Sequence, residues 1–158
     1  PVKRRKSQTL IFLFLILTIL ILDQWTKFLV RIRLAVGESI PVINQALHIT
    51  FVRNTGAAFG LFKHSTSIFI IISIAAIVVI AAIIIRSIKK DKFQTATALN
   101  LGLVLIVSGA LGNLIDRVRF GYVIDFIDVR IWPVFNIADS SITIGTFLLI
   151  WSALLDKK

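Results

Sequence analysis

Three carboxylates lie in a strongly apolar stretch near the end of the chain. The segment 121–141, GYVIDFIDVRIWPVFNIADSS, holds Asp125, Asp128 and Asp139 among Val, Ile, Phe and Trp. If residues 123–128 form a strand, Asp125 and Asp128 point to opposite faces, because side chains alternate along a strand. Asp128 is then expected to be solvated or paired with Arg130, and it is set aside as a partner for Asp125.

Asp125 and Asp139 are the two carboxylates that could work together. Trp132-Pro133 lies between them and could turn the chain back, which would bring them face to face. Two adjacent carboxylates do not both ionise readily, so one of them keeps a proton. Such a pair suits an aspartic protease, in which the ionised carboxylate takes a proton from water and the protonated one polarises the scissile carbonyl. The ordinary alternative is that Asp139 is only the N-cap of a helix.

Other ionisable groups stand near the ends of apolar runs, where an ionisable side chain is a functional candidate. Asp23 and Lys27 are four residues apart, so they share a helix face and could form an ion pair. Lys27 could instead extend to a lipid head group. Asp116 follows Asn113 by about one helical turn, and we expect it in a polar network that fixes the helix end. The adjacent Arg117 would keep Asp116 ionised and occupied, which disfavours catalysis by Asp116.

The elements that must position these acids are membrane spans. The chain of 158 residues is 57% hydrophobic, with a mean hydropathy of +0.92 and long uninterrupted apolar runs. A bilayer core requires about 20 residues of apolar helix. We expect one integral membrane domain over residues 1–158, with spans at about 10–30, 67–85, 96–115 and 136–155 and outer segments at 31–66 and 116–135.

The outer segments are not simple turns. Residues 39–56, SIPVINQALHITFVRNTG, and 122–132, YVIDFIDVRIW, are rich in β-branched and aromatic side chains and end near turn-forming residues, a pattern typical of short strands. The predicted fold class is therefore an all-α membrane protein with a small β element, in which a β platform lies over or beside four transmembrane helices.

The placement of Lys and Arg predicts the orientation of the spans. The two termini and the connection 86–94 carry ten basic and two acidic residues, whereas the other side carries eight basic and six acidic residues. Both termini are therefore expected in the cytoplasm, with the β platform on the outer side. The net charge of +10 is explained by this topology, so no nucleic-acid partner is expected.

Several other chemistries are disfavoured by the residues present. The chain has no cysteine, so it offers no thiolate nucleophile and no Cys-ligated metal. It has no His-Glu-x-x-His motif, and His48 and His64 stand apart in the first outer segment, so no zinc site and no cofactor are expected. Ser140 and Ser141 have no nearby base and are expected to cap a helix.

Four sequence blocks resemble those of a known family. They are DQWTK (residues 23–27), NTGAAFG (54–60), GNLIDRVRFGYVIDFID (112–128) and FNIAD (135–139), and in this order they are similar to the lipoprotein signal peptidase family, also called signal peptidase II. The resemblance implies a bacterial inner-membrane aspartyl protease with its active site near the outer face. It would remove the signal peptide from a prolipoprotein after diacylglyceryl transfer, cutting before the lipid-bearing cysteine.

The same resemblance assigns roles to individual residues. It implies that Asp125 and Asp139 are the catalytic dyad. It further implies pocket or support roles for Asn54, Gly56, Asn113, Asp116, Arg117, Asn136 and Ala138, a polar pair of Asp23 and Lys27, and a contact of Arg53 with substrate backbone or lipid. The expected partners are the diacylglyceryl prolipoprotein and membrane lipid. The enzyme is expected to be a monomer and a target of cyclic-peptide or macrocyclic antibiotics that mimic the tetrahedral intermediate or block the dyad.

Two other functional classes are alternatives to a protease. A proton-coupled transporter also uses membrane carboxylates, but here the acids gather at one face and no repeat is evident. A structural or assembly subunit would not need polar blocks in both outer segments. Within the protease hypothesis, Asp139 at a helix N-terminus should be favoured as the anion, which leaves Asp125 with the shared proton.

Overall fold

The described part of the chain forms four helices and three strands. A computed structural model describes residues 2–56, 66–89 and 98–155. The elements in chain order are α1 (Val2–Arg33), β1 (Ser39–Ile43), β2 (Leu47–Asn54), α2 (Thr66–Lys89), α3 (Ala98–Phe120), β3 (Val123–Asp128) and α4 (Ile137–Leu155).

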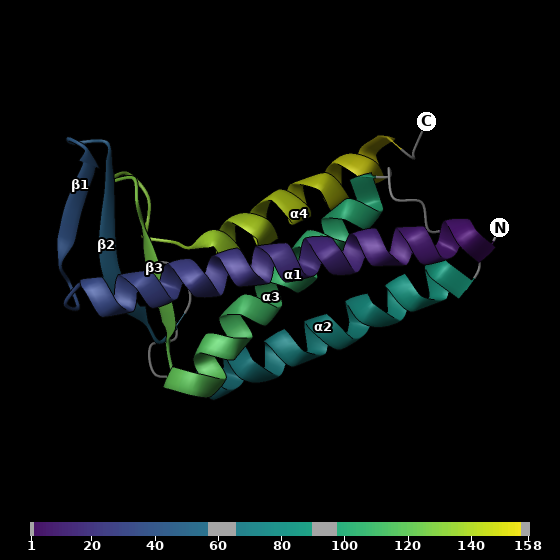
Figure 1. The fold of residues 1–158 in the computed structure, drawn as a ribbon, viewed down its shortest axis with the longest axis horizontal. Coiled ribbons are helices and arrows are strands. Elements are labelled where there is room, and N and C mark those ends of the chain that lie inside the picture. Colours follow the sequence, from purple (N-terminus) through teal and green to yellow (C-terminus); the bar gives the residue numbers. More distant parts are fainter. Residues whose placement is uncertain (1, 57–65, 90–97, 156–158) are drawn as a thin grey trace.

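The sheet lies at one end of the helices, and α1 begins and α4 ends at the opposite end (Figure 1). The central helix is α3, which contacts each of the other three helices. About half of the residues of α3 are buried, whereas no residue in the most apolar window of α2 is buried inside the protein. The bundle is therefore organised around α3, with much of the apolar surface of the other helices turned outward.

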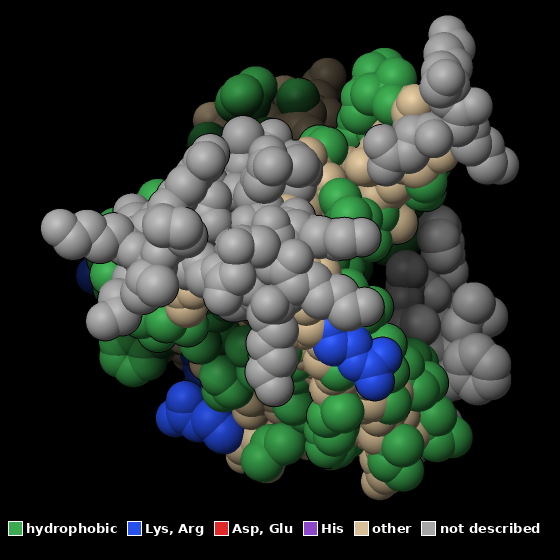
Figure 2. Space-filling model, turned by 90° about the vertical axis from the view of Figure 1, so that its right-hand side faces the viewer, with side chains coloured by type: hydrophobic (Ala, Val, Ile, Leu, Met, Phe, Trp, Pro, Cys, Tyr) green, Lys and Arg blue, Asp and Glu red, His purple; other side chains and the backbone are tan. Residues whose placement is uncertain are grey.

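All four helices are long and apolar enough to cross a membrane. The candidate spans are Thr9–Arg33, Thr66–Ser87, Ala98–Phe120 and Ile137–Leu155. Large apolar side chains such as Phe14, Ile71 and Phe147 are more than 60% exposed, and hydrophobic side chains cover much of the described surface around the end of the bundle opposite the sheet (Figure 2). An outward apolar surface suits contact with lipid rather than water. The predicted four-span membrane fold with a small β element is confirmed.

Close packing of α3 against α4 depends on glycine. A β-carbon added to Gly102 would lie 2.7 Å from the carbonyl oxygen of Gly145, and one added to Gly145 would lie 2.7 Å from that of Gly102. About two helical turns after Gly102, Gly109 lies against the backbone of Ala138. Small residues let two helix backbones approach in a membrane. This contact places the start of α4 beside the middle of α3.

The sheet is antiparallel with the order β1-β2-β3. Val52 of β2 pairs with Asp125 of β3, and a register irregularity lies between Ile49 and Val52. A core of Phe51, Ile124 and Phe126 packs on Val30 and Leu34 at the end of α1. Burial of this core fixes β3 against the bundle, because each large apolar side chain contributes roughly 1.5–3 kcal/mol when fully buried.

The boundaries of three helices differ from the sequence-based prediction. The helix α1 runs from Val2 to Arg33 and so extends beyond the predicted span 10–30 at both ends. Residues 116–120, expected in the second outer segment, continue α3 to Phe120, where Gly121 at φ +78° ends the helix. The helix α2 runs to Lys89, into the predicted connection. Residues 57–60 of the NTGAAFG block, His64, and residues 96–97 of the third predicted span lie outside the described residues. The third span was predicted to end at residue 115 because charged residues follow it. The helix continues because Asp116 is satisfied by tertiary contacts that a sequence does not reveal.

Candidate active site

A tight reversal of the chain brings Asp125 and Asp139 to one site. After β3, Arg130 adopts φ +66°, and the chain returns so that Phe135 pairs with Ile127. The Phe135 amide donates to the Ile127 carbonyl at 3.1 Å, and the Phe135 carbonyl accepts from the amides of Phe126 and Ile127. The predicted turn around Trp132-Pro133 is confirmed, and the start of α4 lies beside β3.

Asn136, rather than Asp139, caps α4. The Asp139 amide donates to Asn136 Oδ1 at 2.8 Å, and the Asn136 amide donates to Asp139 Oδ2 at 3.2 Å. This reciprocal pair is a capping box, in which the cap residue and the third helical residue satisfy each other's backbone amides. The alternative of Asp139 as the N-cap is wrong. Only Oδ2 of Asp139 takes part in the capping box, which leaves Oδ1 for other partners.

Asparagine amides link the two carboxylates. Asn136 Nδ2 donates to Asp125 Oδ1 at 2.7 Å, and Asn54 Nδ2 donates to Asp125 Oδ2 at 2.9 Å. Asn113 Nδ2 donates to Asp139 Oδ1 at 2.7 Å. Asn136 therefore contacts both Asp125, through its side chain, and Asp139, through its backbone amide and its side-chain oxygen. The arrangement holds each carboxylate in one orientation.

The surroundings of Asp125 favour its protonated form. The larger cause is burial, since Asp125 is 2% exposed, and burial raises its pKa. The nearby Asp139 carboxylate raises this pKa further. Hydrogen bonds from Asn54 and Asn136 and the charge of Lys27 act in the opposite direction. The result is a pKa of about 7 for Asp125. A carboxyl group with this pKa holds a proton over part of the physiological range.

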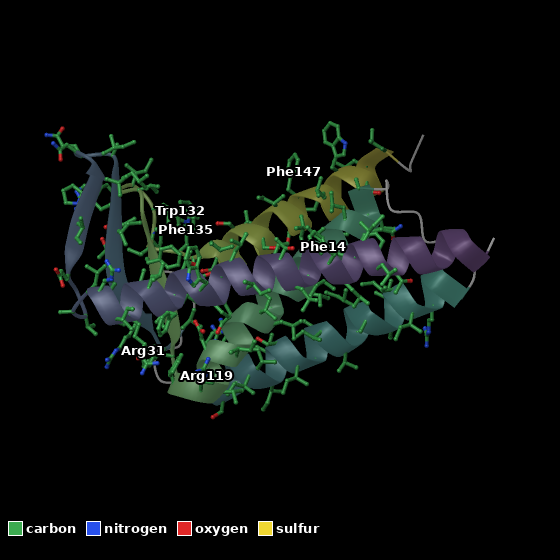
Figure 3. The ribbon with its side chains drawn as sticks, in the orientation of Figure 1. Phe14, Arg31, Arg119, Trp132, Phe135 and Phe147 are labelled. Atoms are coloured by element: carbon green, nitrogen blue, oxygen red, sulfur yellow. The ribbon has the colours of Figure 1, made fainter. Side chains whose placement is uncertain are left out.

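Both carboxylates line a cavity of about 640 Å³. One wall is apolar and comes from the 132–135 turn and α4, and in Figure 3 Trp132 and Phe135 lie close together near the start of α4. The polar lining comes from β2, α3 and the dyad. The residues that line the cavity are Asn54, Gly56, Asn113, Arg117, Val123, Asp125, Trp132, Pro133, Val134, Phe135, Asp139, Ser140, Ile142, Thr143 and Ile144.

Arg117 and Gly56 also line this cavity and contact each other. Arg117 Nη2 donates to the carbonyl of Gly56 at 3.4 Å, and Gly56 in turn donates its amide to Asn54 Oδ1 at 3.0 Å. Arg117 Nε is buried and has no hydrogen-bond partner among the described residues. A buried donor without a partner carries a free-energy cost, which a ligand oxygen would relieve.

A buried charge cluster supports the site from behind. Lys27 Nζ lies 2.8 Å from Asp23 Oδ2 and 2.9 Å from Asp116 Oδ2, and it donates to Asn113 Oδ1 at 3.0 Å. The Asp23–Lys27 ion pair is confirmed. The alternative in which Lys27 reaches lipid is wrong, because Lys27 is 1% exposed. The ion-pair partner of Asp116 is Lys27 rather than the adjacent Arg117. Since Lys27 occupies Asn113 Oδ1, the Nδ2 group of Asn113 is left for Asp139.

Asp23 and Ala138 tie α1 to the start of α4. The amide of Ala138 donates to Asp23 Oδ1 at 2.9 Å, and Ala138 is fully buried. Ala138, Asp23, Lys27 and Asp116 are not among the residues that line the cavity. Their contacts with one another and with Asn113 place them behind the lining, so they can act on a substrate only through the residues that they position.

Three other predicted residues lie away from the cavity. Asp128 is paired with Arg130 at 3.3 Å and accepts from Thr50 at 2.8 Å, as its strand position predicted. Burial opposes its ionisation, but hydrogen bonds from Arg130 and Thr50 hold its pKa below the ordinary value. His48, on β2, accepts from Arg130 Nε at 3.0 Å. Arg53 is exposed, and its guanidinium carbon lies 4.9 Å from the Tyr122 ring centre.

The prediction that Ser140 and Ser141 cap α4 is wrong. Ser140 Oγ donates to the Asn136 carbonyl at 3.0 Å, and Ser141 Oγ donates to the Leu105 carbonyl of α3 at 2.8 Å. Ser140 also lines the cavity. The two serines follow the actual cap by four and five residues, because Asn136 is itself a strong cap residue and stands directly before the helix.

Sequence reasoning missed Gln24 and most of the apolar wall. Gln24 Nε2 donates to Asp116 Oδ1 at 3.0 Å and to the Gly112 carbonyl at 3.2 Å. Its place between Asp23 and Lys27 in the DQWTK block was the available signal. The wall residues 132–135, Ile142 and Ile144 are apolar and carry no chemical signature in the sequence, so only the folded arrangement could identify them.

Comparison with known proteins agrees with this fold. Residues 15–155 match the family model described as Signal peptidase (SPase) II. The chain belongs to the signal peptidase II family. The lipoprotein signal peptidase of Moorella thermoacetica is 47% identical over 145 residues, which cover 91% of this chain and 93% of that protein. That of Halothermothrix orenii is 48% identical over 135 residues, which cover 85% of this chain and 89% of that protein.

Two solved structures share the fold of this signal peptidase II family member. Both are described as bacterial membrane enzymes, determined at 2.3 and 1.9 Å resolution. The first has a TM-score of 0.81 and 38% sequence identity, covering 97% of this chain and 90% of its own. The second has a TM-score of 0.76 and 39% identity, covering 97% and 95%. The family resemblance expected from the four sequence blocks is confirmed, and the chain is a multi-pass membrane protein of a peptidase family.

Proposed function

We propose that this protein is an aspartyl endopeptidase that removes the signal peptide from diacylglyceryl-modified prolipoproteins, cutting before the lipid-bearing cysteine. The observation that carries the proposal is that Asp125 and Asp139 line one cavity and are linked through Asn136. Membership of the signal peptidase II family supports the peptidase activity and the prolipoprotein substrate.

In this mechanism the two carboxylates share one proton. Asp125, with a pKa of about 7, carries the proton and donates a hydrogen bond to the scissile carbonyl oxygen. Asp139 is the anion, favoured by the N-terminus of α4 and by the Asn113 amide, and it takes a proton from the attacking water. The tetrahedral intermediate collapses when the leaving nitrogen accepts a proton from the dyad.

The remaining cavity residues fit roles in substrate binding. Arg117, with its unpartnered Nε, suits a substrate backbone carbonyl. The apolar wall, Trp132 to Phe135 with Ile142 and Ile144, suits apolar side chains of the signal peptide near the cut. Asn54, Asn113 and Asn136 orient the carboxylates, whereas Asp23, Lys27, Asp116 and Ala138 support them through packing and charge. Gly56 leaves room for a substrate backbone.

The setting of the enzyme is also part of the proposal. We place it as a monomer and a single integral domain in the bacterial cytoplasmic (inner) membrane, with both termini in the cytoplasm and the cavity near the outer face. Cyclic-peptide or macrocyclic antibiotics that mimic the tetrahedral intermediate would occupy the cavity at the dyad. The start of α1 and the end of α4 lie at the end away from the sheet (Figure 1), which is compatible with this topology.

A cleavage assay with matched variants tests the proposal. Purified protein in detergent is incubated with a diacylglyceryl prolipoprotein, and the loss of the signal peptide is followed on a gel. Asp125→Asn and Asp139→Asn should each lower the rate by about a thousandfold or more, because loss of a group that acts as a unit with its partner removes most of the catalysis. Asp128→Asn, the same change on the same strand outside the cavity, should retain activity.

The proposal would be overturned by either of two results. One is no cleavage by the unchanged protein when the diacylglyceryl substrate is supplied. The other is equal activity of Asp125→Asn, Asp139→Asn and the unchanged protein, which would exclude the dyad while leaving the peptidase assignment intact.

A further inference from the structure

Arginine side chains and aromatic rings gather where α1 and α3 end beneath the sheet. The guanidinium carbon of Arg31 lies 4.4 Å from the ring centre of Phe120, and that of Arg119 lies 5.1 Å from the same ring. Figure 3 shows Arg31 and Arg119 at the same corner of the molecule. Two helices that are far apart in the chain thus present their last-turn arginines to one aromatic ring.

Arg53 of β2 and Tyr122, which directly precedes β3, extend this group. The Tyr122 ring centre lies 6.0 Å from that of Phe120, and the guanidinium carbon of Arg53 lies 4.9 Å from the Tyr122 ring centre. We call Arg31, Arg53, Arg119, Phe120 and Tyr122 the arginine–aromatic surface. Stacking on a ring holds a guanidinium group flat while its N–H donors remain available at the edge.

Among the described residues, the positive charge of this surface has no carboxylate partner. Arg31, Arg53 and Arg119 are all exposed, and within residues 2–56, 66–89 and 98–155 none of them forms an ion pair. The ion pairs of the described part of the chain instead involve Lys27 and Arg130. Three guanidinium groups held near one another without a counter-charge repel each other, so an anion that binds between them is favoured electrostatically.

The surface lies where the apolar part of two spans gives way to polar residues. Phe28 and Val118, each within three residues of one of these arginines, are 56% and 67% exposed, which suits contact with lipid. Arg31 and Arg33 end α1, and Arg117 and Arg119 lie in the last turn of α3. Arginine and aromatic side chains at the ends of spans are typical of the head-group level of a bilayer.

We propose that the arginine–aromatic surface binds the phosphate of an anionic phospholipid of the surrounding bilayer. The guanidinium fork matches two phosphate oxygens, which makes arginine the preferred partner for such a group. A net negative head group neutralises the cluster, whereas the ammonium of a zwitterionic head group is repelled by it. None of the five residues lines the catalytic cavity, so the lipid site is separate from the proposed peptidase reaction.

Native mass spectrometry of the full-length protein in detergent tests this site. Phosphatidylglycerol and phosphatidylcholine are added in equal amounts, and the lipid retained by each variant is measured. The unchanged protein should retain phosphatidylglycerol preferentially. The double variant Arg31→Gln/Arg119→Gln should weaken its binding by about 25-fold, because each basic residue near an anionic head group contributes about a fivefold gain.

Two variants control for charge and for stacking. Arg86→Gln, an exposed arginine of α2 near the opposite end of the bundle, removes a similar charge and should keep the preference. Phe120→Leu keeps every arginine but removes the ring that holds two of them, and it should weaken phosphatidylglycerol binding severalfold. The double variant should retain peptidase activity in detergent without added lipid, which also shows that it is folded.

Three outcomes would overturn the lipid site. The first is equal retention of the two lipids by the unchanged protein. The second is equal loss of phosphatidylglycerol in Arg86→Gln and the double variant. The third is displacement of the lipid by millimolar inorganic phosphate, which would indicate a site for free phosphate. Each of these results is independent of whether the protein cleaves prolipoproteins.

Discussion

At the scale of single residues, asparagine side chains control the two carboxylates. Asn54 and Asn136 donate to Asp125, and Asn113 donates to Asp139. Hydrogen bonds of this kind stabilise an ionised carboxylate, so they oppose the effect of burial on its pKa. The balance leaves Asp125 with a pKa of about 7, a value that makes its protonation sensitive to small changes around it.

The pH dependence of activity should report this pKa. Because burial and Asp139 raise the pKa of Asp125 to about 7, its proton is held below that pH and lost above it. Cleavage should therefore decline as pH rises through about 7. Asn54→Ala removes a hydrogen bond that lowers the pKa, so the decline should move to higher pH by about one unit. Initial rates of prolipoprotein cleavage between pH 5 and 9 measure both effects, and a decline that moves to lower pH in Asn54→Ala would contradict the assignment.

Lys27 should dominate the stability of the support cluster. Lys27→Met leaves Asp23 and Asp116 as buried carboxylates without their cation, and such a loss costs about 3–5 kcal/mol. Arg130→Met is the matched control, because it removes the partner of Asp128 from a position that is 44% exposed and should cost at most about 1 kcal/mol. Thermal unfolding in detergent compares the two variants. Equal melting temperatures would show that the buried cluster does not stabilise the fold.

At the scale of the elements, the α3–α4 contact sets the position of the dyad. Gly102 faces Gly145, and Gly109 faces Ala138, so the two helices meet closely along their length. Asn113 on α3 and Asp139 on α4 are within hydrogen-bond distance because of this contact. The β3 strand reaches the same place through its pairing with β2 and the return at Phe135.

Gly145→Ala should separate α3 from α4. The new β-carbon would lie 2.7 Å from the Gly102 carbonyl oxygen, a backbone atom that cannot move alone, and overpacking of this kind costs typically 1–3 kcal/mol. In an unpacked helix the same change would stabilise by roughly 0.5–1 kcal/mol. The melting temperature of Gly145→Ala relative to the unchanged protein therefore distinguishes the two cases. A fall is expected, and a rise would show that the helices do not meet at this position.

At the scale of the whole molecule, the four helices form the membrane-spanning part, and the candidate active site lies towards the end that carries the sheet. No residue in the most apolar window of α2 is buried inside the protein. The polar groups that line the cavity come from β2, β3, α3, α4 and Gly56, and the sheet that supplies two of these elements lies at one end of the helices (Figure 1). This separation suits a lipid-anchored substrate, whose acyl chains stay in the bilayer while the peptide enters the cavity near its surface.

The orientation in the membrane can be tested by labelling. The chain has no cysteine, so each introduced cysteine is unique. Ala46→Cys, in the turn between β1 and β2, should react with a membrane-impermeant maleimide added to intact spheroplasts, because the positive-inside rule places the sheet outside. Ser87→Cys, near the end of α2, should react only after the membrane is opened. The reverse pattern of labelling would contradict the proposed topology.

Local pattern in the sequence determined the spans, the strands and the separation of Asp128 from Asp125, because these follow from hydrophobicity and side-chain alternation among neighbouring residues.

Tertiary structure alone decided which polar groups meet. Lys27 binds Asn113, which is 86 residues away, and Ala138 donates to Asp23, which is 115 residues away. Asn136, not Asp139, became the cap of α4, since the reversal at Phe135 sets where the helix begins. Burial makes each of these polar contacts necessary, and only the folded chain determines which partner is near enough to satisfy it.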